Sequence, residues 1–210
     1  MQIEFAGQKE ETLPDGTALN TLNLRGPIAA EVFGGGISNA MTGLSQMVGR
    51  DIKITQLSFK KVMVKDIPNL FGGPENLIIG VYLSITGYAN GHMVVIYEPQ
   101  TAFDLIDLLL SQPQGTTREL SDMEQSVLGE VGNIMGSFFL NHIANTTGLS
   151  FQPSPPAVMM DMAGAILDSA LGNVLEIDDY TYIVETTFGS PDRQVTGAFL
   201  IVPAPEMEFV

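Results

Sequence analysis

One predicted helix carries an unusual row of polar side chains. The segment 121–145 has helical periodicity, and successive residues of an α-helix lie about 100° apart around its axis. On that geometry, one narrow polar stripe contains Ser126, Glu130, Asn133, Ser137 and Asn141. A solvated helix normally fills such a stripe with Lys and Glu, whereas this stripe has a single charge among carboxamides and hydroxyls. The carboxylate of Glu130 and the carboxamide of Asn133 are therefore the candidate functional groups of this stripe.

Glycines interrupt the same helix at Gly129, Gly132 and Gly136. Each costs about 1 kcal/mol relative to Ala in a helix interior, so a compensating contact is expected. Close approach of another backbone is the usual reason for such glycines. The residues expected to face a core, largely on the side away from the polar stripe, are Val127, Val131, Ile134, Met135 and Phe138.

The pair Glu-x-x-Asn is by itself typical of many solvated helices. The wider pattern is more specific, because Ser126 lies four residues before Glu130 and Pro156 follows Asn133 after 22 intervening residues. The motif to be explained is therefore Ser-x3-Glu-x2-Asn-x22-Pro.

Secondary-structure signals place this helix in a chain of helices and strands. Ser121 and Glu124 form a capping-box pattern at its start, and Gly49 and Gly148 are placed to end the two long helices in a left-handed conformation. Helices are expected over 28–48, from Pro99 onward, over 121–145 and over 160–171. Strands are expected over 52–64, 77–86, 92–97, 174–188 and 194–202.

The order of these signals predicts an internal duplication. Glu31 precedes Gly49 by 18 residues, and Glu130 precedes Gly148 by the same interval. The segment 91–96 also echoes 197–202, although chance similarity of two helix–strand units is the alternative. We expect an α/β (α+β) fold in which two half-domains, 22–113 and 118–210, form one pseudo-twofold domain. Long helices would pack on a largely antiparallel sheet, and residues 1–21 have no assigned role.

Composition limits the classes of function. The chain has 210 residues, 45% of them hydrophobic, with 24 acidic and 9 basic residues and a net charge of −15. That charge repels phosphate backbones and makes nucleic acid an improbable partner. The absence of cysteine excludes disulfides and a thiol nucleophile, and the two histidines lack the spacing of zinc ligands. Without an apolar run of about 20 residues or a leader-like start, we expect no membrane insertion and a cytoplasmic location.

The motif of Ser126, Glu130, Asn133 and Pro156 resembles the signature of the CheC, CheX and FliY family of chemotaxis phosphatases. The similarity extends over about 28–204, and further segments that resemble CheC are 35–45, 70–75, 102–110 and 161–168. The resemblance implies hydrolysis of the phosphoaspartate of a CheY-type response regulator in bacterial or archaeal chemotaxis, a two-component signal-transduction system. In that family pattern Asn133 orients the attacking water and Glu130 pairs with the receiver's lysine.

The same resemblance implies supporting roles and partners. Ser126 would contact the receiver or tune the helix surface, and Pro156 would shape the adjoining strand entry. No intrinsic cofactor is expected, because the receiver brings its own Mg²⁺. The receptor deamidase CheD is a further expected partner, on resemblance alone.

The first half departs from the pattern. It has Pro27, Glu31 and Gly34 at the positions equivalent to the Ser, Glu and Asn of the second-half motif. Glycine has no side chain that could hold a water, so the first site is predicted to be inactive. Asn39, five residues after Gly34, cannot replace it, because it is turned well away from Glu31 on a helix.

Two interpretations stay open at this stage. The chain could be a non-enzymatic adaptor or a flagellar switch-type protein that binds phosphorylated CheY or CheD, although the intact Glu130–Asn133 pair favours catalysis. The methionine cluster Met159, Met160 and Met162 fills a core in the default interpretation and forms an adaptable binding surface in the alternative.

Overall fold

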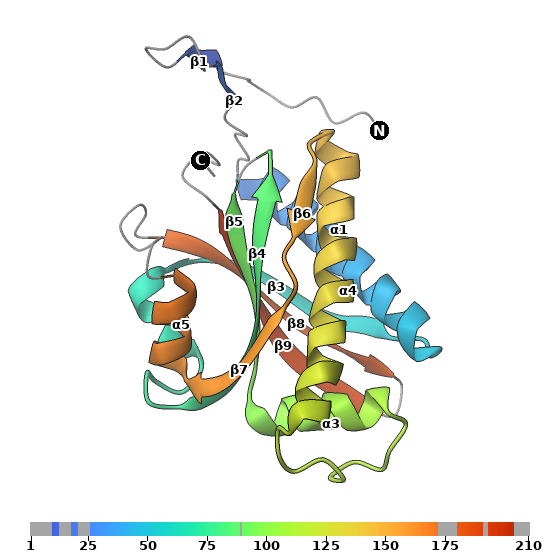
Figure 1. The fold of residues 1–210 in the computed structure, drawn as a ribbon. Coiled ribbons are helices and arrows are strands. Elements are labelled where there is room, and N and C mark those ends of the chain that lie inside the picture. The colour runs from blue at the N-terminus through green and yellow to red at the C-terminus, as the bar shows by residue number, and fades with distance from the viewer. Residues whose placement is uncertain are drawn as a thin grey trace.

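The chain folds around one seven-stranded sheet whose pairings are antiparallel, as Figure 1 shows. A computed structural model describes residues 10–12, 18–20, 26–88, 90–171, 180–190 and 193–203. The strands of this sheet are β3 (Lys53–Met63), β4 (Leu77–Gly87), β5 (Gly91–Tyr97), β6 (Phe151–Pro153), β7 (Ala157–Met162), β8 (Tyr180–Ser190) and β9 (Arg193–Pro203). The helices are α1 (Gly26–Val48), η1 (Val64–Asp66), α2 (Ile67–Leu70), α3 (Pro99–Leu109), α4 (Asp122–Thr147) and α5 (Ala163–Leu171). Two short strands, β1 (Glu10–Thr12) and β2 (Ala18–Asn20), pair with each other in a separate sheet.

The strand order interleaves the two ends of the chain. It runs β3-β8-β9-β5-β4, and both β6 and β7 pair with β4. Thus β3, from early in the chain, pairs with β8, whereas β7, from late in the chain, pairs with β4. The order is symmetric about the central β9–β5 pair, and the predicted α+β class with an antiparallel sheet is confirmed. The division into halves at 22–113 and 118–210 stays a prediction.

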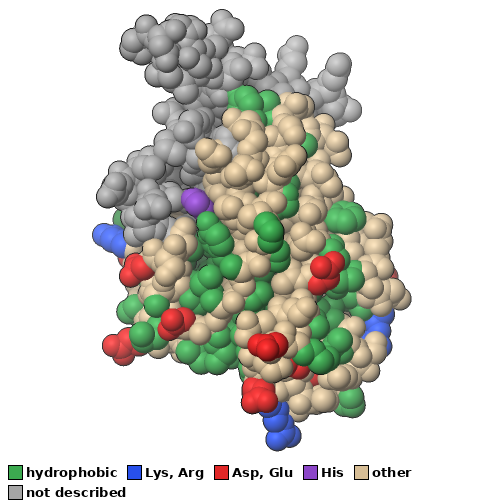
Figure 2. Space-filling model, in the orientation of Figure 1, with side chains coloured by type: hydrophobic (Ala, Val, Ile, Leu, Met, Phe, Trp, Pro, Cys, Tyr) green, Lys and Arg blue, Asp and Glu red, His purple; other side chains and the backbone are tan. Residues whose placement is uncertain are grey.

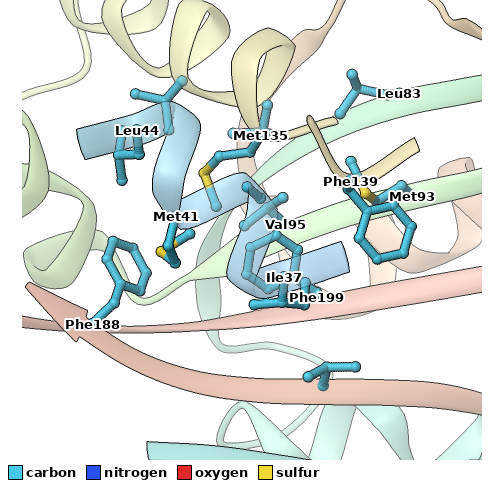
Figure 3. Packing of buried hydrophobic residues seen from close by; sticks show 14 of the residues in the cluster. Ile37, Met41, Leu44, Leu83, Met93, Val95, Met135, Phe139, Phe188 and Phe199 are labelled. Atoms are coloured by element: carbon cyan, nitrogen blue, oxygen red, sulfur yellow. The ribbon is translucent and has the colours of Figure 1, made fainter. Parts of the chain in front are cut away.

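The core lies on both faces of the sheet. On one face, α1 and α4 pack together, and Figure 3 shows Ile37, Met41 and Leu44 of α1 beside Met135 and Phe139 of α4. The smaller cluster on the opposite face lies under α2 and α5 and contains Ile67, Ile78, Val94, Ile96, Ile166, Leu167 and Leu200. Each strand of the sheet centre is therefore buried on both sides, which suits its β-branched and aromatic residues.

Helices α1 and α4 approach closely because glycines line their contact. A Cβ atom at Gly36 would lie 2.5 Å from Cδ2 of Phe139, and one at Gly43 would lie 2.6 Å from Cδ2 of Phe138. Asn39 donates its amide N–H to the backbone carbonyl of Phe138 at 2.6 Å. Asn39 is therefore committed to the helix contact, in agreement with the prediction that it cannot serve the first site.

Most predicted elements are confirmed, and one is wrong. Gly49 and Gly148 follow the long helices with φ of 66° and 75°, as predicted for left-handed C-terminal caps. The predicted helix over 160–171 starts only at Ala163, since Met160 and Met162 belong to strand β7. A short apolar run does not distinguish helix from strand, and pairing with the exposed edge of β4 decides the matter. The part of the predicted strand over 174–179 lies outside the described residues.

A buried carboxylate fixes the loop between α3 and α4. Asp107 is fully buried and accepts hydrogen bonds from the backbone N–H groups of Thr116 and Thr117, at 3.0 and 2.9 Å, and from the Thr117 hydroxyl at 2.7 Å. Burial raises the pKa of Asp107, but these hydrogen bonds outweigh burial and leave the pKa below its usual value. The loop that leads into α4 is thereby held against the core.

We expect Asp107→Asn to lower the free energy of unfolding by about 2–4 kcal/mol at pH 7, because the N–H groups of Thr116 and Thr117 and the Thr117 hydroxyl lose an ionised acceptor. The contribution is present above the unfolded pKa of about 3.9 and is lost as the pH falls through the depressed folded pKa. Urea unfolding between pH 7 and pH 3 should therefore show a difference from wild type that shrinks at low pH. Asp104→Asn is the matched control, since its carboxylate bonds only the exposed amides of Gln100 and Gln114 in the described chain. Equal effects of the two variants would contradict the role of Asp107.

Candidate functional site

Helix α4 is fixed at both ends. Ser121 occupies the N-cap position with extended φ and ψ of −78° and 177°. Its hydroxyl donates to the Glu124 carboxylate, and this hydrogen bond lowers the pKa of Glu124. The capping pair is thus present as predicted, although Ser121 bonds the Glu124 side chain rather than a backbone N–H. Gly148 donates its N–H to the carbonyl of Ala144 at 2.8 Å and ends the helix.

The predicted polar stripe faces solvent. Ser126, Glu130, Asn133 and Asn141 are exposed, and Ser137 is half-buried. Of the residues predicted to face the core, Val131 and Met135 are buried, and those that are half-buried are Val127, Ile134 and Phe138.

The helix glycines place α4 directly on strand β4. A Cβ atom at Gly132 would lie 2.4 Å from Cγ1 of Val81, and one at Gly136 would lie 2.9 Å from Cδ2 of Leu83. The close approach predicted from the glycines is therefore present, but the partners are side chains of the sheet rather than another backbone. Because α4 sits so close to the sheet, the stripe lies next to the chain segment that enters β7.

A shallow hollow of about 380 Å³ joins the predicted site residues. It is lined by Gly129, Glu130 and Asn133 of α4 and by residues 153–156, so the structure brings Glu130, Asn133 and Pro156 together. Ser126 does not line it. We call this feature the α4 hollow.

Hydrogen bonds to β4 hold the wall of the α4 hollow. The backbone N–H of Ser154 donates to the Ser84 carbonyl at 2.8 Å, and the Ser84 N–H donates to the Ser154 hydroxyl oxygen at 3.0 Å. That hydroxyl in turn donates to the carbonyl of Pro155 at 3.0 Å. Pro156 follows with its fixed φ, within 4 Å of where a side chain at Gly129 or Gly132 would begin.

The two side chains of the motif are available to a partner. Within the part of the chain that the structure describes, neither Glu130 nor Asn133 makes a side-chain hydrogen bond or an ion pair. The same part of the chain contains no group of three His, Cys, Asp or Glu side chains that could hold a metal ion. What this site presents is a carboxylate and a carboxamide one helical turn apart beside a rigid wall.

The first-half motif has different surroundings. Pro27, Glu31 and Gly34 all lie on α1, and the side chain of Glu31 is outside the described residues. Gly34 is half-buried, and a Cβ atom there would lie 3.4 Å from Cδ2 of Leu57 on β3. Leu57 follows Gly34 after 22 residues, as Pro156 follows Asn133. The sequence analysis missed Leu57, although this repeated spacing could have revealed it.

A larger cavity lies away from the motif. Its volume is about 530 Å³, and it opens on the sheet face opposite α4, where it is lined by side chains that include Gln56, Glu98, Glu185, Thr187 and Thr196. None of the predicted site residues lines it. The larger volume of this cavity therefore does not make it the candidate site. The α4 hollow is the better candidate, because residues of the motif line it.

Comparison with known proteins finds relatives of this chain. A model of the CheC-like family matches residues 123–160, which run from the first turn of α4 to β7. The chain is also 26% identical over 169 residues to the CheY-P phosphatase CheC of Bacillus subtilis (strain 168), covering 80% of this chain and 81% of that protein. The chain is therefore similar to the CheC-like family over this segment and to a CheC protein over most of its length.

Solved structures share the fold of this CheC-like chain. The crystal structure of Thermotoga maritima FliY matches with a TM-score of 0.70 at 20% identity, over 84% of this chain and 88% of that one. A chain of the CheX-CheY-BeF3-Mg+2 complex from Borrelia burgdorferi matches with a TM-score of 0.51 at 17% identity, over 83% of this chain and 97% of that one. Among the described residues of the CheC-like chain, no helix is long and apolar enough to cross a membrane.

We expect Gly132→Ala to lower the free energy of unfolding by about 1–3 kcal/mol, since its Cβ would overlap Val81 and push α4 off the sheet. Gly34→Ala is the matched control on α1, where the new Cβ meets only ordinary contact with Leu57. That variant should gain up to about 1 kcal/mol from helix propensity. Urea unfolding of both variants measures the contrast, and equal shifts would contradict the close seating of α4.

Proposed function

We propose that this CheC-like chain hydrolyses the phosphoaspartate of a CheY-type response regulator at the α4 hollow. The observation that carries the proposal is the exposure of Glu130 and Asn133 in one hollow, with neither side chain engaged within the described chain. Residues with no internal partner are free to enter another protein's active site. The relative from Bacillus subtilis is named as a CheY-P phosphatase, which supports the same substrate class.

The proposed chemistry is the orientation of one water molecule. Water attacks phosphorus in line, the bond between phosphorus and the aspartyl oxygen breaks, and the products are inorganic phosphate and the receiver's free carboxylate. An acyl phosphate is already reactive, so positioning is the main catalytic term that remains. The Asn133 carboxamide can accept a hydrogen bond from the water without adding negative charge beside the phosphoryl group. A carboxylate at that position would repel the substrate.

Glu130 has a different proposed role, which is to fix the docked receiver. An exposed carboxylate one turn from Asn133 can pair with the receiver's lysine, and a charge pair that is desolvated on docking contributes to both register and affinity. Ser126, one turn nearer the helix N-terminus, is proposed to contact the receiver, and Pro156 to hold the wall of the α4 hollow. The receiver is proposed to supply Mg²⁺, which would neutralise the charge that develops on the phosphoryl group.

The alternative is a non-enzymatic adaptor or a flagellar switch-type protein that binds phosphorylated CheY. An exposed Glu130 could bind the receiver in a phosphatase or in an adaptor, so the rate of phosphate release decides between the two functions. CheD is a second proposed partner, on resemblance alone.

We expect Asn133→Ala to lower turnover by about 100-fold, since the water loses its orienting group. The affinity for the receiver should stay within about twofold, because Asn133 lies on an exposed face and truncation leaves the fold intact. Phosphate release from a panel of phosphorylated CheY-type receivers measures turnover. Asn141→Ala is the matched control, as it removes an exposed carboxamide from the same stripe two turns away.

Glu130→Ala should instead weaken receiver binding by about tenfold or more, since it removes the docking charge pair. Unchanged activity of Asn133→Ala would sink the site assignment. Wild-type binding of phosphorylated receivers without any turnover would establish the adaptor alternative.

We expect the first half to contribute no hydrolysis. Gly34 cannot place a water within the roughly 3 Å needed for attack, so Glu31→Ala should leave turnover within about twofold of wild type. The double variant Glu130→Ala, Asn133→Ala should release phosphate no faster than the receiver alone. Residual Mg²⁺-dependent hydrolysis that disappears on adding Glu31→Ala would show that the first half is catalytic.

A further inference from the structure

An exposed apolar surface lies on the strand that leaves the α4 hollow. Leu77, Met160 and Met162 expose 42%, 42% and 47% of their surface, which is unusual for large apolar residues that sit next to one another. Leu77 and Met162 are direct cross-strand partners in the β4–β7 pair, and Met160 pairs with Ile79 two residues along each strand. We call Leu77, Met160 and Met162 the β7 patch.

The β7 patch is on the same face of the sheet as α4. A Cβ atom at Gly129 would lie 3.8 Å from Cγ2 of Val158, so the side chain of Val158 points toward α4. Side chains alternate along a strand, which puts Met160 and Met162 on the face of Val158. Met159 points the other way and packs against the cluster under α5. The methionine cluster is therefore divided, with one member packed against the core and two on the surface.

A partner at the α4 hollow must cover more than the hollow itself. A stable protein interface buries about 800 Å² on each side, which corresponds to a disc with a radius of about 16 Å. Strand β7 starts one residue after Pro156, and a strand rises about 3.3 Å per residue. Met160 is then about 13 Å from the wall of the α4 hollow, within such a disc, whereas Met162 is about 20 Å away, outside a disc centred on the hollow. An interface of this size that extends toward β7 covers both residues.

The opposite direction along α4 offers a different surface. Toward the helix C-terminus, the stripe continues with Ser137 and Asn141, which are polar. Toward the N-terminus it continues with Glu130 and Ser126 and reaches Met123, which is 54% exposed. Interface centres are enriched in Met and depleted of charged residues, and the flexible thioether side chain adapts to a partner's shape. The exposed apolar side chains near Asn133 are therefore Met123, toward the N-terminus of α4, and those of the β7 patch.

The charges around the β7 patch indicate a partner with basic groups. Figure 2 shows this face, with hydrophobic side chains over β7 beside α4 and acidic side chains scattered around them. Asp161, the one charged residue of β7, alternates onto the opposite face with Met159. The acidic residues on the α4 side are Asp122 and Glu124, in the first turn of α4. The other sheet edge, β3, is different, because it carries Lys53 and Lys60 in ion pairs with Asp51 and Glu185. Lysine on an edge strand discourages association, whereas β7 has none.

We propose that the β7 patch is the apolar anchor of the CheY-type receiver whose phosphoryl group reaches Asn133. This inference rests on the proposed function for the identity of the partner. The receiver would present an apolar surface flanked by basic groups next to its phosphoaspartate. The β7 patch supplies affinity, and the α4 hollow supplies the chemistry.

The test separates affinity from turnover. Met160→Glu and Met162→Glu place a charge at the proposed anchor, and Met47→Glu is the matched control, since Met47 is 38% exposed near the end of α1. Each variant is titrated with CheY-type receivers activated by beryllofluoride and Mg²⁺, and phosphate release is measured on the phosphorylated receivers. Circular dichroism confirms that each variant folds, and the neutral truncations Met160→Ala and Met162→Ala are measured alongside.

We expect the two anchor variants to raise Kd and KM at least tenfold, with kcat at saturating receiver within twofold of wild type. The neutral truncations should raise Kd about threefold, and Met47→Glu should have no effect. Wild-type affinity of the anchor variants, or equal weakening by Met47→Glu, would overturn the anchor while leaving the proposed hydrolysis intact. Receivers that bind through Met160 but are not hydrolysed would overturn the proposed function and leave the anchor. Failure of all receivers to bind the wild-type chain would overturn both.

Discussion

The close seating of α4 on the sheet is the constraint on which the site depends. Gly132 and Gly136 leave no room for a side chain above Val81 and Leu83, so the helix axis is drawn toward β4. The chain segment before β7 is fixed to the same strand through Ser84 and Ser154. Both walls of the α4 hollow therefore contact β4. The distance between Asn133 and Pro156 is set by these contacts with the sheet.

The two long helices, α1 and α4, use glycine for different contacts. On α1, Gly36 and Gly43 admit the rings of Phe139 and Phe138 from α4, so these glycines serve helix–helix packing. On α4, the glycines serve helix–sheet packing. Phe138 and Phe139 occupy the side of α4 that meets α1, which leaves the stripe of Glu130 and Asn133 uncovered. The packing of α1 thus fixes the rotation of α4 and keeps the motif exposed.

Local signals in the sequence predicted much of this arrangement, because they are properties of single segments. The cap at Ser121, the left-handed glycines and the polar stripe each follow from a few neighbouring residues, and all are present. The strand identity of Met160 and Met162 could not be predicted, since it arises from pairing with Leu77 and Ile79, some 80 residues away. The partners of Gly132 were likewise unpredictable, as a sequence shows that space is needed but not what fills it.

A site that orients a water, rather than supplying a reactive group, draws its selectivity from docking. In the proposed reaction the labile bond and the metal belong to the receiver, and this chain adds one carboxamide at the correct distance. Misplacement by about 1 Å can cost 100-fold in such a reaction, so an incorrectly bound receiver is a poor substrate even when Asn133 is intact. In that proposal, docking groups such as Glu130 and the β7 patch determine which phosphoaspartates are hydrolysed, because they set the register in which Asn133 enters the receiver.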